Sequence, residues 1–234
     1  MQIDSRRGDF LVAKNHFAVQ SGGMETDWAA EHLQTIRTLM ERSAVYRRAL
    51  APIMVWNGIV GLVGGVSGGV AGNVRGLSSR AFIIFWSGAA LLAILGSFLL
   101  VRRQALKDSE PFWSPPTRRI AQALLPPLFI GGFLNGTVAY MFPHDPGVAA
   151  FLVAFWMWLY GCAAHAAGFF MVRGMKAFGW LFIVAGCGLF TMLLNLDWPF
   201  NSVTSSFIMG IVFGGLHLVY GVYLYLTEKG KNAA

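Results

Sequence analysis

The chain has 234 residues, of which 56% are hydrophobic and only 12% are charged, with a formal net charge of +7. Soluble globular proteins carry about 25% charged residues. The composition therefore argues against a soluble domain and favours a bilayer, in which charged side chains are costly. The first residues lack the continuous apolar core of a secretory signal peptide, so we expect the first apolar segment to act as an uncleaved insertion signal.

Two segments precede that first apolar stretch. Residues 1–26 are polar and non-periodic, which predicts a disordered cytoplasmic tail, with Met24 as an alternative start to Met1. Residues 27–48 predict a cytoplasmic amphipathic helix, because Asp27 is a suitable N-cap residue and apolar residues recur at helical spacing after it. Such a helix either lies on the inner leaflet or binds a partner, or it only extends the first spanning helix.

Six stretches are long and apolar enough to cross a bilayer, which takes about 20 mostly apolar residues. None of them contains Asp, Glu, Lys or Arg, and their continuous apolar character argues against alternating β-barrel strands. We therefore expect an all-α integral membrane bundle, with a six-helix transmembrane domain over residues 49–226 and a cytoplasmic tail over 227–234. The predicted spans are Leu50–Gly72, Ala81–Val101, Ile120–Phe142, Gly147–Val172, Ala177–Asn195 and Ser205–Leu226.

The placement of Lys and Arg predicts the orientation, because cytoplasmic connections carry an excess of both. One side holds seven in the N-terminal region, five in the second connection, two in the fourth and two in the C-terminal tail, whereas the other side holds only Arg75 and Arg80. Both termini are therefore expected in the cytoplasm. The N-terminal region has a net charge of only +1, so nucleic acid is not an expected partner.

Arginine pairs lie at three of the predicted inner helix ends. They either bind anionic lipid headgroups or act only as topology signals. The pairs are Arg47 and Arg48, Arg102 and Arg103, and Arg118 and Arg119.

Glycines at every fourth position predict close helix packing, since small residues let membrane helices approach. The partner is another helix of the same chain or a second copy, so a homodimer or a membrane complex stays open. In the third span, Pro126 and Pro127 predict a kink, and broken helices occur at transporter binding sites. The ladders are Gly61, Gly65 and Gly69; Gly64, Gly68 and Gly72; and Gly210 and Gly214.

Few polar residues lie inside the predicted spans, and such residues are candidates for function. His165, His217, Asn57 and Asn135 are candidates for ligand or proton chemistry. The predicted boundaries put both histidines, Cys162 and Cys187 at similar depth, a composition that suits zinc or copper. Two histidines on separate helices would also suit axial haem ligation. The alternative is packing, in which each histidine bonds a backbone carbonyl or the hydroxyl of a tyrosine such as Tyr160 or Tyr220, and no cofactor is expected.

The chain contains no nucleotide-binding loop, metalloprotease motif or serine-nucleophile elbow, which disfavours an enzyme. The stretch IRTLMERSAVYRRALAPIM, Ile36–Met54, resembles a segment of bacterial polytopic inner-membrane proteins with no assigned activity. The resemblance implies a bacterial inner-membrane setting and no catalytic residues. The leading hypothesis is a non-enzymatic regulatory or assembly component. The alternatives are a small solute transporter or channel, and a metal- or haem-binding redox subunit.

Overall fold

The computed structural model describes residues 49–74, 76–107, 109, 111–145, 147–171, 174–195 and 200–232. These residues belong to one compact unit, Val45–Ala234. The predicted N-terminal tail, the predicted amphipathic helix, and Arg47 and Arg48 lie outside the described residues.

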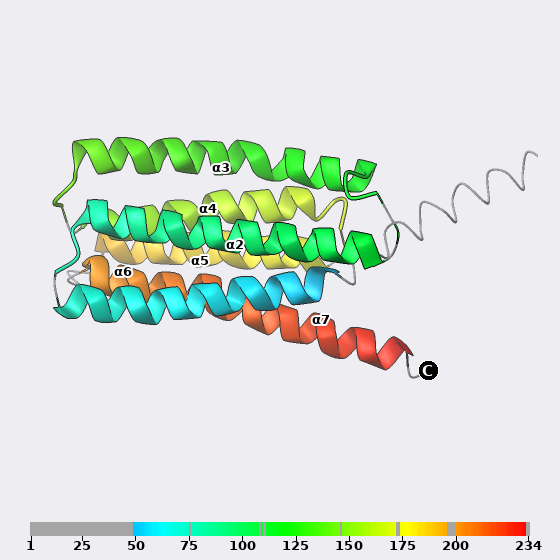
Figure 1. Ribbon diagram of the computed structural model, residues 1–234. Coiled ribbons are helices and arrows are strands. Elements are labelled where there is room, and N and C mark those ends of the chain that lie inside the picture. The colour runs from blue at the N-terminus through cyan, green and yellow to red at the C-terminus, as the bar shows by residue number, and fades with distance from the viewer. Residues whose placement is uncertain are drawn as a thin grey trace, which may run out of the picture. The chain divides into compact units, whose positions relative to one another are not determined.

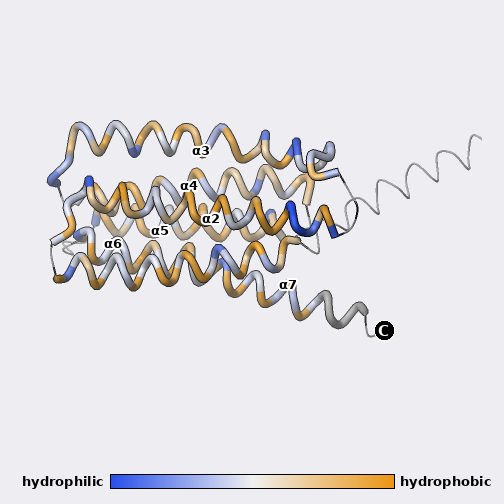
Figure 2. The backbone as a smooth tube through the Cα atoms, in the orientation of Figure 1, coloured by the Kyte–Doolittle hydropathy of each residue, from blue (hydrophilic) through white to orange (hydrophobic). Residues whose placement is uncertain are grey.

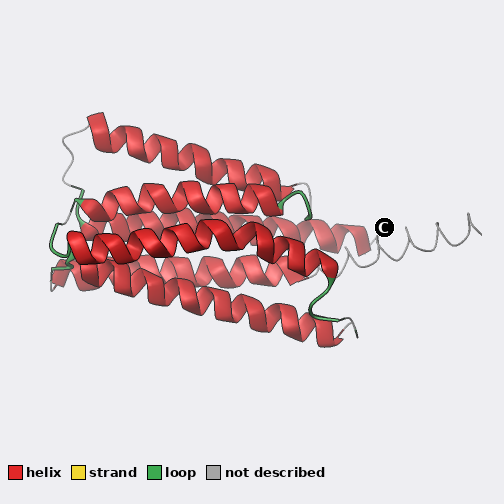
Figure 3. Cartoon of the chain, turned by 90° about the horizontal axis from the view of Figure 1, so that it is seen from above, coloured by secondary structure: helices red, strands yellow, loops and turns green. Residues whose placement is uncertain are grey.

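The described chain is a bundle of helices that run side by side (Figures 1 and 3). Among the described residues there is no strand. The sixth span is built from three pieces, with the π-helical segment η1 in the middle. In chain order the elements are an unlabelled first helix, Ala49–Val74, then α2 (Ser79–Lys107), α3 (Pro115–Met141), α4 (Val148–Ala167), α5 (Gly174–Asn195), α6 (Ser202–Met209), η1 (Gly210–Gly215) and α7 (Leu216–Asn232).

Six of these helical spans are long and apolar enough to cross a membrane, and hydrophobic residues dominate them (Figure 2). The prediction of an all-helical, multi-pass membrane protein is confirmed at this level. Four predicted boundaries differ from the structure by five residues or more. They are the end of α2, the end of the fourth span, the start of α3, which is Pro115 rather than Ile120, and the end of α7, which is Asn232 rather than Leu226. α2 continues to Lys107 rather than ending at Val101, because its last residues are good helix formers whose polarity hid them from a hydropathy criterion.

The fourth span ends at Ala167 rather than Val172. The N–H groups of Phe169 and Phe170 donate to carbonyls only three residues back, so the helix tightens and stops. Gly168 lies against Lys176 of α5, where a methyl group would come within 2.8 Å of a Lys176 side-chain carbon. The chain therefore reverses where a larger residue would not fit.

α4 is the central helix of the bundle. Half of its most apolar window is buried, and it packs most extensively against α5 and next against α3. The α4–α5 contact is close because two glycines face each other: a methyl group on Gly161 would lie 2.8 Å from the carbonyl oxygen of Gly179. α2 and α3 bury far less of their surface, and the ribbon of α3 lies at the edge of the bundle (Figure 1).

Glycines also join the first helix to the sixth span. A methyl group on Gly61 would lie 2.6 Å from Cα of Gly214, and one on Gly65 would lie 2.6 Å from Cα of Gly210. Gly69 meets the ring of Phe207 one turn further on. The two ladders of these helices thus face each other inside one chain, backbone against backbone.

The second ladder of the first helix faces α2 as well. Gly64 lies against the ring of Trp86, and Gly68 lies between Phe85 and Ser206. Gly72 lies against Val203 of α6. One glycine-rich helix therefore packs closely on two neighbours at once.

The π-helical segment lies where the two backbones are closest. From the contact of Val55 with Gly221 to that of Gly72 with Val203, the first helix has 18 residues and the sixth span has 19, which is one residue more. A π turn takes up one extra residue, so η1 keeps the two antiparallel helices in register along their length.

α3 remains one continuous helix through Pro126 and Pro127. It begins after Ser114 with prolines at its first positions, where a missing N–H costs nothing. A helix can bend at proline without a break, so the predicted kink stays a prediction, while the π-helical segment of the bundle lies in the sixth span.

We expect replacement of Gly61 by alanine to destabilise the bundle, because the added carbon would meet the backbone of Gly214 and neither backbone can rotate away. Overpacking of this kind costs about 1–3 kcal/mol. Gly132 is the matched control, since open space surrounds it on α3. Fluorescence-detected size-exclusion chromatography after heating in detergent should show a lower apparent Tm for G61A and an unchanged or higher one for G132A. Equal Tm values for both variants would contradict the close contact.

Candidate functional site

His217 is the buried polar residue with the most complete set of partners. It lies in the first turn of α7, directly after the π segment, and is 3% exposed. Its Nδ1 lies 2.6 Å from the carbonyl oxygen of Phe213, and its Nε2 lies 2.5 Å from the hydroxyl of Tyr160 on α4. A carbonyl oxygen can only accept, so Nδ1 donates to it, and Nε2 accepts from the tyrosine hydroxyl.

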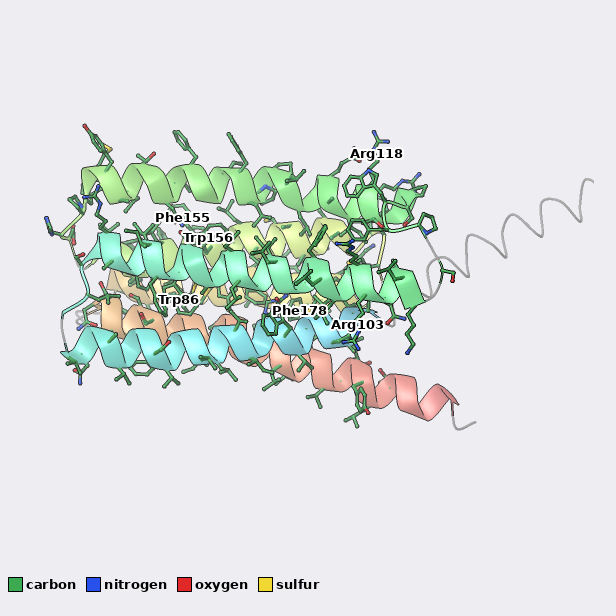
Figure 4. All side chains as sticks on the ribbon, viewed as in Figure 1. Trp86, Arg103, Arg118, Phe155, Trp156 and Phe178 are labelled. Atoms are coloured by element: carbon green, nitrogen blue, oxygen red, sulfur yellow. The ribbon has the colours of Figure 1, made fainter. Side chains whose placement is uncertain are left out.

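Aromatic rings enclose this histidine–tyrosine pair. The ring centroids of Phe178 and Phe182 on α5 lie 5.0 Å and 5.6 Å from that of His217. Phe213 contacts both Tyr160 and Phe182, at 5.5 Å and 4.9 Å. Phe178 points into the bundle in Figure 4, and its ring stacks on Tyr220 at 4.8 Å.

The arrangement joins three spans through one neutral side chain. Tyr160 comes from α4, Phe178 and Phe182 lie one helical turn apart on α5, and His217 belongs to the sixth span. Both ring nitrogens already have hydrogen-bond partners, and the surroundings are apolar. The pair therefore serves as a polar link between helices, which is the packing role foreseen for a membrane histidine.

His165 lies elsewhere, in the last turn of α4. Its Nδ1 is 3.4 Å from the carbonyl oxygen of Lys176, and its ring lies edge-on to Phe169 and Trp180. The predicted fourth span continued to Val172, and the expectation that His165 shares one depth with His217 and the cysteines stays a prediction. Since α4 ends at Ala167, His165 lies at the end of its helix.

The four residues considered for a metal or haem are not gathered by this arrangement. Cys162 and Cys187 are both exposed on the helix surfaces, and neither nitrogen of His217 is left for a ligand. Across the part of the chain that the structure describes, no three His, Cys, Asp or Glu side chains come together. These four residues therefore do not form one cluster among the described residues.

The two candidate asparagines each bond across a helix interface. Asn57 of the first helix accepts from the hydroxyl of Ser97 on α2 at 3.1 Å. Asn135 of α3 donates to Ser87 of α2 at 3.3 Å and accepts from Trp156 of α4 at 3.0 Å. Trp156 also packs its ring on Gly131 of α3, and Figure 4 shows it between α3 and α4.

No family model, no curated protein and no solved structure matches the chain. Family membership is therefore not shown. The description of the site rests on its geometry alone.

The phenylalanine side chains around His217 were not identified from the sequence. Phe213 stands four residues before His217, and Phe178 and Phe182 are also four residues apart. Both spacings put side chains on one helix face, which was an available signal. That α4, α5 and α7 meet at this point is decided only by the tertiary structure.

We expect Y160F to lower the thermal stability of the detergent-solubilised protein, because it leaves Nε2 of His217 without its donor. Bonds between membrane helices are worth about 1 kcal/mol. Y220F is the matched control from the same cluster, since the buried hydroxyl of Tyr220 has no partner among the described residues. Thermal melts should show a lower Tm for Y160F and an unchanged or higher Tm for Y220F. A loss of similar size in both variants would show that the hydrogen bond to His217 is not what stabilises the cluster.

Proposed function

We propose that this chain is a non-enzymatic, multi-pass component of a bacterial inner membrane that acts in regulation or assembly, with both termini in the cytoplasm. The observation that carries the proposal is the use of its membrane-embedded polar groups. Asn57, Asn135 and His217 each bond to a residue of another helix. Polar side chains that already hydrogen-bond to another helix favour a fixed scaffold over a reactive centre.

The three links together span most of the bundle. One joins the first helix to α2, the second joins α2, α3 and α4, and the third joins α4 to the sixth span. A bundle tied in this way would act through the surfaces and segments that it presents to other molecules. The predicted amphipathic helix at residues 27–48, for which the sequence pattern is the support, is the segment proposed to bind a partner.

The distribution of charge supports the proposed orientation. Among the described side chains, six Lys and Arg residues stand at the end of the bundle where α2 finishes and α3 begins, whereas Arg80 is the one at the opposite end. The excess of positive charge belongs on the cytoplasmic side. The resemblance of Ile36–Met54 to bacterial inner-membrane proteins supports the same location.

The orientation predicts the behaviour of two reporter fusions. Green fluorescent protein fused after Ala234 should fluoresce in a bacterial host, and alkaline phosphatase fused at the same place should be inactive. Phosphatase placed in the connection between the first helix and α2, at Gly76, should be active because that connection is proposed to face outward. The opposite pattern of activities would reverse the orientation.

The assembly role predicts a membrane partner that depends on residues 27–47. A protein recovered in stoichiometric amount with the full chain from native membranes in mild detergent should be lost on deletion of 27–47. It should be retained on deletion of 1–23, which is the matched control. Quantitative mass spectrometry measures both. Equal recovery after the two deletions would contradict the proposed role of the helix.

A small solute transporter or channel is the second candidate, and the π segment favours it. Such segments occur often at functional sites, and η1 lies directly before His217. Proteoliposomes that carry the pure protein distinguish the two proposals. Solute flux that falls in H217A but not in G132A would support transport, whereas a partner bound through 27–47 without flux would support assembly.

A further inference from the structure

One end of the bundle concentrates positive charge beside exposed aromatic side chains. We call the cations there the basic rim, and Figure 4 shows two of them, Arg103 and Arg118, at this end. No carboxylate stands among the described side chains at this end, and the sequence adds Asp108 and Glu110 in the connection between α2 and α3. Even with these two counted, the rim is strongly positive. It comprises Arg102, Arg103, Lys107, Arg118, Arg119 and Lys176.

The connection between α2 and α3 brings two arginine pairs to the same level. The ring of Phe98, one turn before Arg102, lies 5.0 Å from the ring of Phe112 in the connection. The carbonyl oxygen of Phe112 in turn accepts from the hydroxyl of Thr117 at 3.0 Å. These contacts tie the end of α2 to the start of α3, so both arginine pairs belong to one end of the bundle, with Arg103 and Arg118 on different sides of it (Figure 4).

Two further contacts tie the rim to the connection between α4 and α5. The guanidinium carbon of Arg119 lies 5.8 Å from the ring centre of Phe170, and the Nζ of Lys176 lies 3.5 Å from that of Phe169. These cations rest on rings and not on carboxylates. A contact with a ring does not use up the N–H groups of a guanidinium as hydrogen-bond donors, and Arg binds oxyanions through these groups in bidentate fashion.

From this geometry we infer that the basic rim binds the phosphate headgroup of an anionic phospholipid from the same bilayer. The apolar surroundings fit a lipid rather than a free anion. Phe98 and Leu99, just inside the rim on α2, are 47% and 60% exposed and would meet the acyl chains. Trp113 and Phe169, 61% and 64% exposed, stand at the level where aromatic side chains anchor at the interface.

The bound lipid would link parts of the bundle that touch little otherwise. α3 buries little of its surface, and its first turn reaches the connection between α4 and α5 through Arg119 and Phe170. A phosphate held by Arg119 beside Phe170 would hold the start of α3 to the connection between α4 and α5. The inference requires only that the bundle lies in a membrane, and so it stands apart from the proposed regulatory or assembly role.

Native mass spectrometry of the full-length protein in detergent tests the inference, with phosphatidylglycerol, cardiolipin and phosphatidylcholine titrated separately. We expect both anionic lipids to bind more tightly than phosphatidylcholine. Replacement of two arginines in R118Q/R119Q should weaken anionic lipid binding about tenfold or more, since each basic residue near anionic lipid contributes about one tenfold step or slightly less. R80Q, which removes a cation at the opposite end, is the matched control and should bind as the unmodified protein does.

Equal binding of the three lipids would overturn the inference. So would a loss of anionic lipid binding in R80Q as large as the loss in R118Q/R119Q. Displacement of phosphatidylglycerol by millimolar inorganic phosphate would overturn the assignment of a lipid as the ligand. It would show that the basic rim binds a free anion. If R118Q/R119Q does not fold, F170A provides the test, because it removes the ring beneath Arg119 and keeps every charge. Unchanged anionic lipid affinity in a folded F170A and a folded R102Q/R103Q would also overturn the inference.

Discussion

The bundle depends on the contact in which the backbone of the first helix meets that of the sixth span. Gly61 against Gly214 and Gly65 against Gly210 leave no room for even a methyl group. Inside a membrane the lipid tails are as apolar as any side chain, so helices associate through close packing and hydrogen bonds rather than by the hydrophobic effect. The first and last spans close the bundle through this contact, and the π segment adjusts the sixth span to it.

Hydrogen bonds between polar side chains hold the helices together in addition to the glycine contacts. A buried donor or acceptor has no water to bond to at membrane depth, so an unpaired group is costly. Here the asparagines, the tyrosine and the histidine are paired across interfaces: first helix to α2, α2 to α3 and α4, and α4 to the sixth span. The same pairing favours the observed neighbours, because each bond requires two particular helices to lie side by side. The rings around His217 exclude other polar partners from its pair.

The two ends of the bundle differ in the number of described cations that they carry. At one end cations gather where α2, α3, α4 and α5 end or begin, and rings of the connecting segments lie beneath two of them. Positive charge at a membrane surface orients a chain during insertion, so the proposed orientation and the proposed lipid contact would depend on the same residues.

The sequence by itself determined that the chain has six helices long and apolar enough to cross a membrane, because this is a local property of about 20 consecutive residues. It also indicated which helices carry close-packing surfaces, since the glycine ladders are visible at a spacing of four residues. It misplaced the end of the fourth span, because Ala167 and Gly168 are as apolar as the residues before them. Hydropathy does not detect the tight turn that ends this helix.

Only the tertiary structure decided which helices and side chains contact one another within the bundle. The ladder at Gly61 and Gly65 was equally suited to a second copy, and Cys162 was as plausible beside His217 as Tyr160 was. A helix pattern gives the face on which a side chain lies but not the helix that the face meets, because neighbours in a bundle come from distant parts of the chain. The π segment follows from the same cause, since the register that it restores exists only between two packed helices.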